Sequence, residues 1–129
     1  MSGRFLLDTN IIIAFLGREP AVLAHLTQAE YFAISCITAG ELRYGAHNSG
    51  RVEANPHRID ELLRDAIVLG YDEQTSDLYA RCKINLKRKG RPINENDLWI
   101  AATAMQHGLT LVSRDNDFAA TDNLSLVRW

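Results

Sequence analysis

Short apolar runs alternate with longer segments of helical periodicity along this chain. The apolar runs have the length of strands, and they lie at residues 4–8, 31–35, 67–71, 109–113 and 124–129. Between them, the pattern predicts helices at residues 10–16, 20–28, 38–47, 57–66, 73–90 and 94–108. Pro20 suits a helix start, whereas Gly90 and Gly108 suit helix ends. The polar stretch at residues 48–55 is expected to be a loop.

The alternation of strands and helices predicts the fold class. It is typical of a three-layer α/β/α domain whose central sheet is mainly parallel. A chain of 129 residues without an internal repeat is expected to form one domain, residues 1–129, with its own hydrophobic core. In sheets of this kind, binding sites lie just beyond the carboxyl ends of the strands.

Composition narrows the class of protein. Hydrophobic residues make up 47% of the chain and charged residues 23%, which is ordinary for a globular protein. The net charge of −2 gives no overall field that would attract nucleic acid or a membrane. The apolar run at residues 11–17 is too short to span a bilayer, and Asp8 interrupts any signal peptide, so we expect a cytoplasmic protein. Cys36 and Cys82 are far apart, which indicates reduced thiols rather than a disulfide framework or a zinc site.

Four acidic residues lie at the boundaries of predicted elements. Asp8 ends the first strand between two apolar runs, where a charge is costly unless something pairs with it. Glu41 lies early in the helix that follows the second strand, and Asp97 lies in the first turn of a later helix. Asp115 follows the fourth strand. All four could therefore open on the same edge of the sheet.

A convergence of four carboxylates would favour a divalent cation. Without compensation, the carboxylates would repel one another and resist ionisation. Oxygen ligands without histidine or cysteine favour Mg²⁺ or Mn²⁺ over zinc or copper. Such an ion lowers the pKa of bound water and stabilises negative charge on a phosphate, which suits hydrolysis of a phosphodiester. This chemistry alone does not distinguish RNA from DNA.

Each acid also has a purely structural interpretation. Asp8 could accept N–H groups at the start of the next helix, and Thr38 with Glu41 matches a capping box. Asn94 and Asp97 could form a similar capping pair, since an early acid also suits the helix dipole. The segment around the fourth acid could be only a polar turn. The order of the four acids along the chain and their sequence neighbours favour the functional interpretation over the structural one.

These neighbours resemble PIN-domain ribonucleases, and more narrowly the VapC toxins of bacterial type II toxin–antitoxin pairs. The resemblance rests on LLDTNIIIAFL near the N-terminus, ISCITAGELRYGA at 34–46, KGRPINENDLWIAATAMQHGLTLVS at 89–113 and RDNDF at 114–118. It covers nearly the whole chain and implies that residues 1–129 form a single PIN domain. It also implies an endoribonuclease that depends on Mg²⁺, or on Mn²⁺, and that hydrolyses RNA, often structured RNA such as tRNA.

The resemblance assigns the catalytic acids position by position. Asp8 matches the first metal-binding aspartate of the family, in its L-D-T-N motif. Glu41 matches the glutamate of a T-x-x-E-L motif, and Asp97 matches the central aspartate before an I-A-A-x-A helix. Asp115 matches the last acid, and Asp117 is a neighbouring metal-ligand candidate because this loop varies across the family.

Three polar residues are expected to support these acids. Thr9 and Asn10 match the polar positions that follow the first aspartate, and they are expected to orient Asp8 or to hold water. Ser113 stands where threonine is common in the family. Asn10 also argues against a haloacid-dehalogenase-like phosphatase, because that class needs a second aspartate at this position.

Basic residues supply candidate RNA contacts, since an RNA backbone needs positive charge to guide it. The run RCKINLKRKGR at residues 81–91 contains no acid and leads toward Asp97, although it could also be a solvated helix face. Arg43 and Arg114 lie beside site acids and could contact phosphate or pair with a carboxylate. The full set of candidates is Arg43, Lys87, Arg88, Lys89, Arg91 and Arg114.

The resemblance also implies protein partners. VapC-type toxins form homodimers and bind a cognate VapB-type antitoxin in a hetero-oligomer, so DNA would be reached only through the antitoxin. Ile12, Phe15, Leu16 and Leu23 could form part of the antitoxin groove, although core burial explains them equally well. No membrane partner is expected. The alternative function is a non-catalytic PIN-like protein that binds metal, RNA or a partner, but the presence of all four acids favours catalysis.

Overall fold

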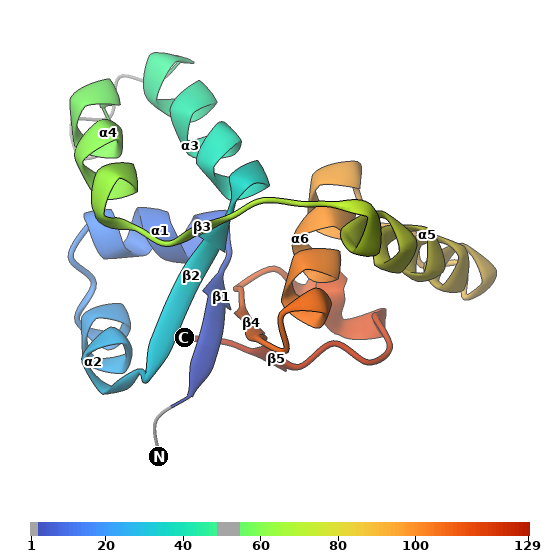
Figure 1. The fold of residues 1–129 in the computed structure, drawn as a ribbon. Helices are drawn as coiled ribbons and strands as arrows, with labels where there is room; N and C mark the ends of the chain where they lie inside the picture. The colour runs from blue at the N-terminus through green and yellow to red at the C-terminus, as the bar shows by residue number, and fades with distance from the viewer. Residues whose placement is uncertain (1–2, 49–54) are drawn as a thin grey trace.

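A five-stranded parallel sheet forms the centre of the computed structural model, which describes residues 3–48 and 55–129 (Figure 1). Its strands are β1 (Arg4–Leu7), β2 (Tyr31–Ser35), β3 (Val68–Leu69), β4 (Thr110–Val112) and β5 (Leu126–Val127). They lie in the order β3-β2-β1-β4-β5, and each neighbouring pair is parallel. The prediction of a mainly parallel sheet is therefore confirmed.

Helices cover both faces of this sheet. They are α1 (Thr9–Leu16), α2 (Pro20–Gln28), α3 (Cys36–Asn48), α4 (Pro56–Asp65), α5 (Glu73–Arg88) and α6 (Glu95–Gln106). Figure 1 shows α1 and α2 on one side of the sheet and α5 and α6 on the other. The three-layer α/β/α prediction is confirmed. Within the described ranges, each helix is too short or too polar to cross a membrane.

Alternation along the strands divides the hydrophobic core between the two faces. Leu7, Ile34 and Val112 point to the face covered by α1, α2, α3 and α4. The preceding residue of each strand points the other way, so that Leu6, Ala33 and Leu111 pack against α6. The outer helix α5 packs on α6 through Cys82, Leu86 and Leu98. Both faces of the sheet are thus buried, as is usual for parallel strands.

Helix boundaries follow local sequence signals. Pro20 occupies the first position of α2, where its missing N–H costs nothing. Gly90 and Gly108 follow α5 and α6 with φ angles of +70° and +63°, a left-handed conformation that glycine adopts without strain. Both predicted helix ends are confirmed. Of the predicted loop at residues 48–55, positions 49–54 lie outside the described residues.

The edge strands and one short helix differ from the sequence prediction. The strands expected at 67–71 and 124–129 reduce to the two-residue strands β3 and β5. Each is an edge strand that pairs on one side only, so little holds a longer ladder in register. A 3₁₀ helix, η1 (Asn116–Ala120), forms in a segment interpreted as a polar turn. Its Phe118 is 1% exposed and belongs to the core beneath α6.

Because Phe118 is an enclosed part of this core, its truncation should leave a cavity. We expect Phe118→Ala to lower the free energy of unfolding by about 3–5 kcal/mol. Urea unfolding would measure this change. Phe32→Ala is the matched control, since Phe32 is 42% exposed and its loss should cost about 1 kcal/mol or less. Equal effects of the two substitutions would contradict the assignment of η1 to the core.

Candidate functional site

Asp8 lies where the central strand β1 gives way to α1. Its backbone N–H donates to Val112 O (2.9 Å), which extends the pairing of β1 with β4 by one residue. Its carboxylate caps α1 by accepting from the N–H of Thr9 (2.8 Å), and Ser113 Oγ donates to the other oxygen (2.7 Å). Asn10 Nδ2 lies 3.4 Å from the same oxygen. The structural interpretation of Asp8 as a helix cap is therefore confirmed. The residue is 5% exposed, and capping α1 does not conflict with a role in a site.

Glu41 reaches the same edge from α3. This helix begins directly after β2, and Ser35 Oγ accepts from the N–H of Thr38 (3.0 Å). The capping box predicted for Thr38 and Glu41 is therefore wrong, because Ser35 caps the helix one turn earlier. Glu41 instead accepts from Thr9 Oγ1 (2.6 Å) and Asn96 Nδ2 (3.3 Å), which tie it to α1 and α6.

Asp97 stands in the first turn of α6 and is 7% exposed. Asn94 caps this helix, since its Oδ1 accepts from the N–H of Asp97 (2.9 Å). The predicted capping pair is confirmed. The same Asn94 side chain also donates from Nδ2 to Asp97 Oδ2 (2.8 Å), a contact that the capping pattern did not predict.

Asp115 enters from the segment between β4 and η1. Ser113 Oγ accepts from its N–H (3.0 Å) while donating to Asp8, so one hydroxyl joins the two acidic segments. Asp115 Oδ1 caps η1 by accepting from the N–H of Asp117 (2.9 Å). Asp117 is exposed, and its charge is not among the main causes that raise the pKa of Asp8 or Asp97, whereas the charge of Asp115 is among them for both. Electrostatically, Asp115 is therefore linked to the two most buried acids, while Asp117 is an exposed residue of η1.

Burial and mutual repulsion perturb the protonation of the two most enclosed acids. Burial is the main cause that raises the pKa of Asp8, with further contributions from the charges of Glu41 and Asp115. Burial also raises the pKa of Asp97 to about 7, and the charges of Asp8, Asp115 and Glu41 add to the effect. The charges of Glu41 and Asp115 therefore act on both buried acids, although the four residues come from four separate segments of the chain.

Neutral groups, rather than cationic ones, contact these carboxylates. Among residues 3–48 and 55–129, the ion pairs all involve other acids, so no lysine or arginine neutralises the four. In the same part of the chain, no three His, Cys, Asp or Glu side chains are already arranged to hold a metal ion. Mg²⁺ keeps several waters and usually binds through one or two carboxylates together with substrate phosphates. An open, uncompensated set of oxygen donors fits such an ion.

The structure sorts the candidate RNA contacts into two groups. Arg43 pairs with Asp60 (2.5 Å), and Lys89 pairs with Asp122 (2.6 Å). Arg114 donates to Glu19 (2.8 Å) and to the carbonyl of the C-terminal residue (2.9 Å). The suggestion that the two arginines pair with site carboxylates is wrong, because each has an acid of its own.

The second group consists of Lys87, Arg88 and Arg91. These residues are exposed at the end of α5 and in the segment that leads to α6. Their side chains make no hydrogen bond or ion pair with any residue that the structure describes. Their positive charge is therefore available to an external partner.

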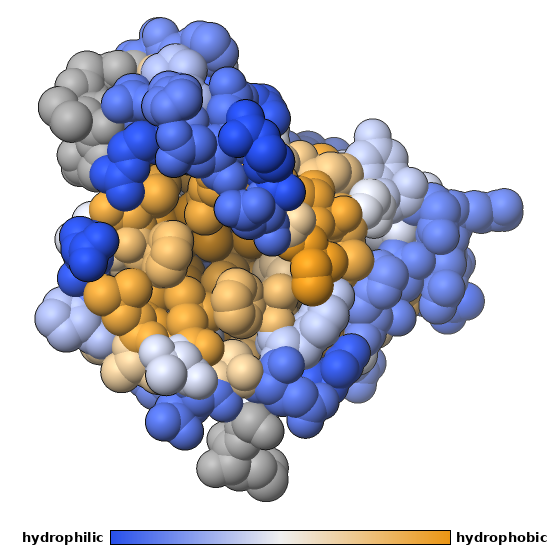
Figure 2. Space-filling view, turned by 60° about the vertical axis from the view of Figure 1, so that its left-hand side comes forward, coloured by the Kyte–Doolittle hydropathy of each residue, from blue (hydrophilic) through white to orange (hydrophobic). Residues whose placement is uncertain are grey.

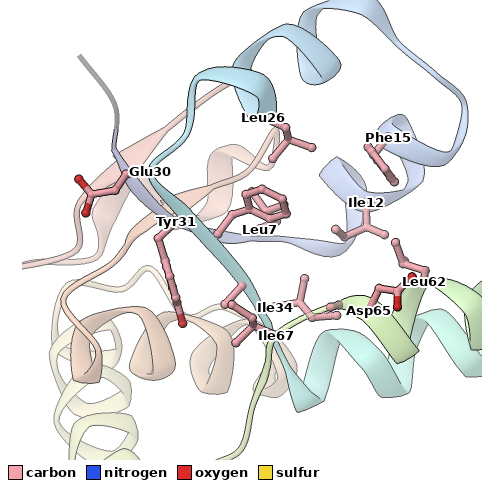
Figure 3. Close-up of a pocket in the computed structure, with 13 residues that line it drawn as sticks. Leu7, Ile12, Phe15, Leu26, Glu30, Tyr31, Ile34, Leu62, Asp65 and Ile67 are labelled. Carbon is pink, nitrogen blue, oxygen red and sulfur yellow. The ribbon is translucent and has the colours of Figure 1, made fainter.

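A second surface feature is an apolar groove of about 490 Å³ beside the sheet. Figure 2 shows it as a hollow surrounded by hydrophobic side chains. Figure 3 shows that side chains from α1, α2, α4 and β2 meet around this space, with Glu30 and Asp65 at opposite ends. Two of the predicted groove residues, Ile12 and Phe15, line it.

The other predicted groove residues lie elsewhere. Leu16 is 5% exposed in the core, and Leu23 is half-buried but does not line the groove. The sequence pattern missed Phe32 and Ile67, which line the groove and are 42% and 47% exposed. The hydrophobic pattern predicted that both residues belong to strands. It could not show that their side chains stay exposed beside the short edge strand β3.

Comparison with known proteins identifies the family. Residues 5–124 match the model of the PIN domain. The chain is 37% identical over 129 residues to ribonuclease VapC2 of Haemophilus influenzae, with 98% of each chain covered. It is 33% identical over 124 residues to ribonuclease VapC5 of Mycobacterium tuberculosis, which covers 94% of this chain and 90% of that protein.

Solved structures agree with this result. The crystal structure of VapBC2 from Rickettsia felis, bound to a DNA fragment from their promoter, contains a chain with a TM-score of 0.87 and 29% identity, with 97% of this chain and 98% of that chain covered. VapBC-1 from nontypeable Haemophilus influenzae gives a TM-score of 0.84 and 33% identity, with 97% of each chain covered. The chain therefore belongs to the PIN-domain family, in its VapC branch.

The raised pKa of Asp97 generates a prediction about stability without metal. Between pH 4 and 7, the folded protein retains a proton that the unfolded chain releases, so the free energy of unfolding should fall as the pH rises through this window. Asp97→Asn removes the titration and should be more stable than the wild type above pH 7. Since one pKa unit corresponds to about 1.4 kcal/mol, the rise from 3.8 to about 7 limits the gain to about 4 kcal/mol.

Urea unfolding in EDTA at several pH values would measure this effect. Asp60→Asn is the control, because Arg43 lowers the pKa of Asp60 and the substitution should bring no gain in stability at high pH. A difference between Asp97→Asn and the wild type that is the same at pH 4 and pH 8 would contradict the prediction.

Proposed function

We propose that this protein is an endoribonuclease that acts as the toxin of a type II toxin–antitoxin pair. The observation that carries the proposal is the set of four uncompensated carboxylates at the carboxyl ends of β1 and β4 and the starts of α3 and α6. The relatives named ribonuclease VapC support the assignment to RNA hydrolysis. RNA is therefore the proposed substrate, and the site residues keep the roles that the family resemblance gave them.

The proposed cofactor is Mg²⁺, with Mn²⁺ as a substitute. Asp8, Glu41, Asp97 and Asp115 would hold the ion, which supplies a water of lowered pKa and charge stabilisation on the phosphate when bound. In the hydrolysis, the oxygen of a water molecule bonds to phosphorus and gives up a proton, while the bond from phosphorus to the 3′ oxygen breaks and this oxygen takes up a proton. The products are a 5′-phosphate and a 3′-hydroxyl, so the 2′-hydroxyl takes no part.

The chain itself must orient the carboxylates and the RNA. Ser113 and Thr9 donate hydrogen bonds that hold Asp8 and Glu41 in place. Lys87, Arg88 and Arg91 offer unpaired positive charge near the start of α6, where the RNA backbone would otherwise meet mostly acidic groups. Arg43, Lys89 and Arg114 already have acidic partners, so they contribute less to this path.

Metal-dependent RNA cleavage tests the enzymatic proposal. Purified toxin should cut RNA from a bacterial host at discrete sites in Mg²⁺, leaving 5′-phosphate ends, and EDTA should abolish the cuts. Asp8→Asn and Asp115→Asn should each lower the cleavage rate more than about 100-fold, because each removes a charged ligand oxygen. Mapping of RNA ends by sequencing would measure both site and rate.

Asp117→Asn is the matched control, since Asp117 lies two residues from Asp115 but is exposed and is not among the charges that raise the pKa of Asp8 or Asp97. It should cleave at nearly the wild-type rate. If all variants and the EDTA sample cleaved alike, a contaminating nuclease would be responsible. If the protein bound metal but did not cut RNA, after removal of any co-purified antitoxin, the non-catalytic binding alternative would replace the enzyme.

The apolar groove supports the second half of the proposal, a cognate VapB-type antitoxin. Phe32 and Ile67 leave apolar surface open to solvent, which is costly unless a partner covers it. Asp65 at one end forms no ion pair among the described residues and favours an apolar segment with a basic residue at that end, whereas Glu30 at the other end pairs with Arg4 (3.5 Å). The solved relatives are VapBC complexes, some of them bound to DNA. We infer that this chain forms a similar hetero-oligomer, contacts DNA only through the antitoxin, and pairs with a second copy of itself.

A charge placed in the groove should weaken antitoxin binding without affecting cleavage. Ile67→Glu would bury a carboxylate under the antitoxin, so we expect its dissociation constant to rise about 10- to 100-fold. Calorimetric titration of each toxin variant with the antitoxin would measure this. Ile84→Glu is the control, because Ile84 is similarly exposed (50%) but lies on α5, away from the groove. Equal affinity of both variants would place the antitoxin elsewhere.

A further inference from the structure

Two asparagines flank Glu95 at the start of α6, and each donates a hydrogen bond to a site carboxylate. Asn94 Nδ2 donates to Asp97 Oδ2 (2.8 Å), and Asn96 Nδ2 donates to Glu41 Oε2 (3.3 Å). Both side chains are exposed at the edge of the acidic cluster. The sequence pattern had explained only the capping bond of Asn94.

Asn94 and Asp97 are joined by two hydrogen bonds. Asn94 Oδ1 accepts from the backbone N–H of Asp97 (2.9 Å) while its Nδ2 holds the carboxylate of the same residue. Serine or aspartate would cap a helix about as well as asparagine, since each supplies the acceptor oxygen. Neither supplies an amide donor that can hold the carboxylate from this position. The second bond is therefore what distinguishes asparagine from the other good caps here.

Asn96 has a comparable role toward α3. Glu41 has a long side chain, and fixing such a side chain costs on the order of 1–2 kcal/mol of conformational entropy. Thr9 Oγ1 holds one carboxylate oxygen from α1, and Asn96 holds the other from α6. The Glu41 carboxylate thus accepts one hydrogen bond from α1 and one from α6. Loss of Asn96 would free it on the side of Asp97.

We propose that Asn94 and Asn96 are positioning residues that aim Asp97 and Glu41 at the bound cation. The inference rests on the proposed function, because it assumes that these carboxylates hold a divalent metal. The amides are suited to the task because they are neutral. A lysine or arginine in the same place would orient the carboxylates but would also neutralise the charge that attracts the cation.

The test uses Asn94→Ser and Asn96→Ser in the full chain, with Mn²⁺ as the probe. Asn94→Ser keeps an oxygen that can cap the helix and removes the amide N–H₂; the single hydroxyl of the shorter serine side chain replaces both amide groups. Mn²⁺ affinity, measured by electron paramagnetic resonance, should fall about 10-fold in each variant. The thermal unfolding midpoint without metal should stay near that of the wild type. In cleavage assays, saturating Mn²⁺ should restore most of kcat, and the KM for RNA should not change.

Asn55→Ser is the matched control, because Asn55 caps α4 by accepting from the N–H of Arg58 and lies outside the acidic cluster. Its Mn²⁺ affinity should equal that of the wild type. If Asn94→Ser and Asn96→Ser also bound Mn²⁺ like the wild type, the inference would fail while the proposed function stood. If all three variants lost affinity equally, the effect would be a general one, and the inference would again fail. A wild type that binds no Mn²⁺ would overturn the proposed function as well.

Discussion

Repulsion among four carboxylates is the constraint around which the rest of the structure is organised. The sheet and two helix starts hold Asp8, Glu41, Asp97 and Asp115 close enough for each to disfavour ionisation of the most buried ones. Stability alone would favour a lysine or an arginine among them, yet no lysine or arginine of the described residues forms an ion pair with any of the four. The neighbours of the four are hydroxyls, amides and backbone N–H groups, which orient a carboxylate without neutralising it. The fold thus retains an uncompensated negative site at a cost in stability, in agreement with the cation proposed above.

The hydrophobic cores on the two faces of the sheet stabilise the fold against the repulsion among the carboxylates. Leu6 and Leu7 point to opposite faces of the sheet and anchor the strand that ends at Asp8. On α6, Ile100, Ala101 and Ala104 pack against the sheet, and the two small alanine side chains permit a close approach of the helix. That closeness brings Asp97 within electrostatic reach of Asp8. Rigid elements therefore hold each acid, although the acids repel one another.

The acidic site and the apolar groove share one segment of chain. Leu7 and Ile12 line the groove, and Asp8 lies between them in sequence. A partner that fills the groove would thus rest against the same strand and helix that hold Asp8. The segment from Leu7 to Ile12 therefore belongs to both features.

The sequence by itself determined the fold class and the chain order of the acids. Hydrophobic alternation and helix signals such as Pro20, Gly90 and Gly108 act locally, so they can be interpreted without knowledge of distant residues. Only the tertiary structure decided which contacts form across the chain. It linked Asp115 rather than Asp117 electrostatically to the two most buried acids, gave Arg43 and Arg114 partners outside the site, and left Ile67 uncovered. It also turned Asn94 and Asn96 toward two carboxylates, one of them 55 positions away. Such contacts depend on how helices pack on the sheet, and no local pattern encodes that packing.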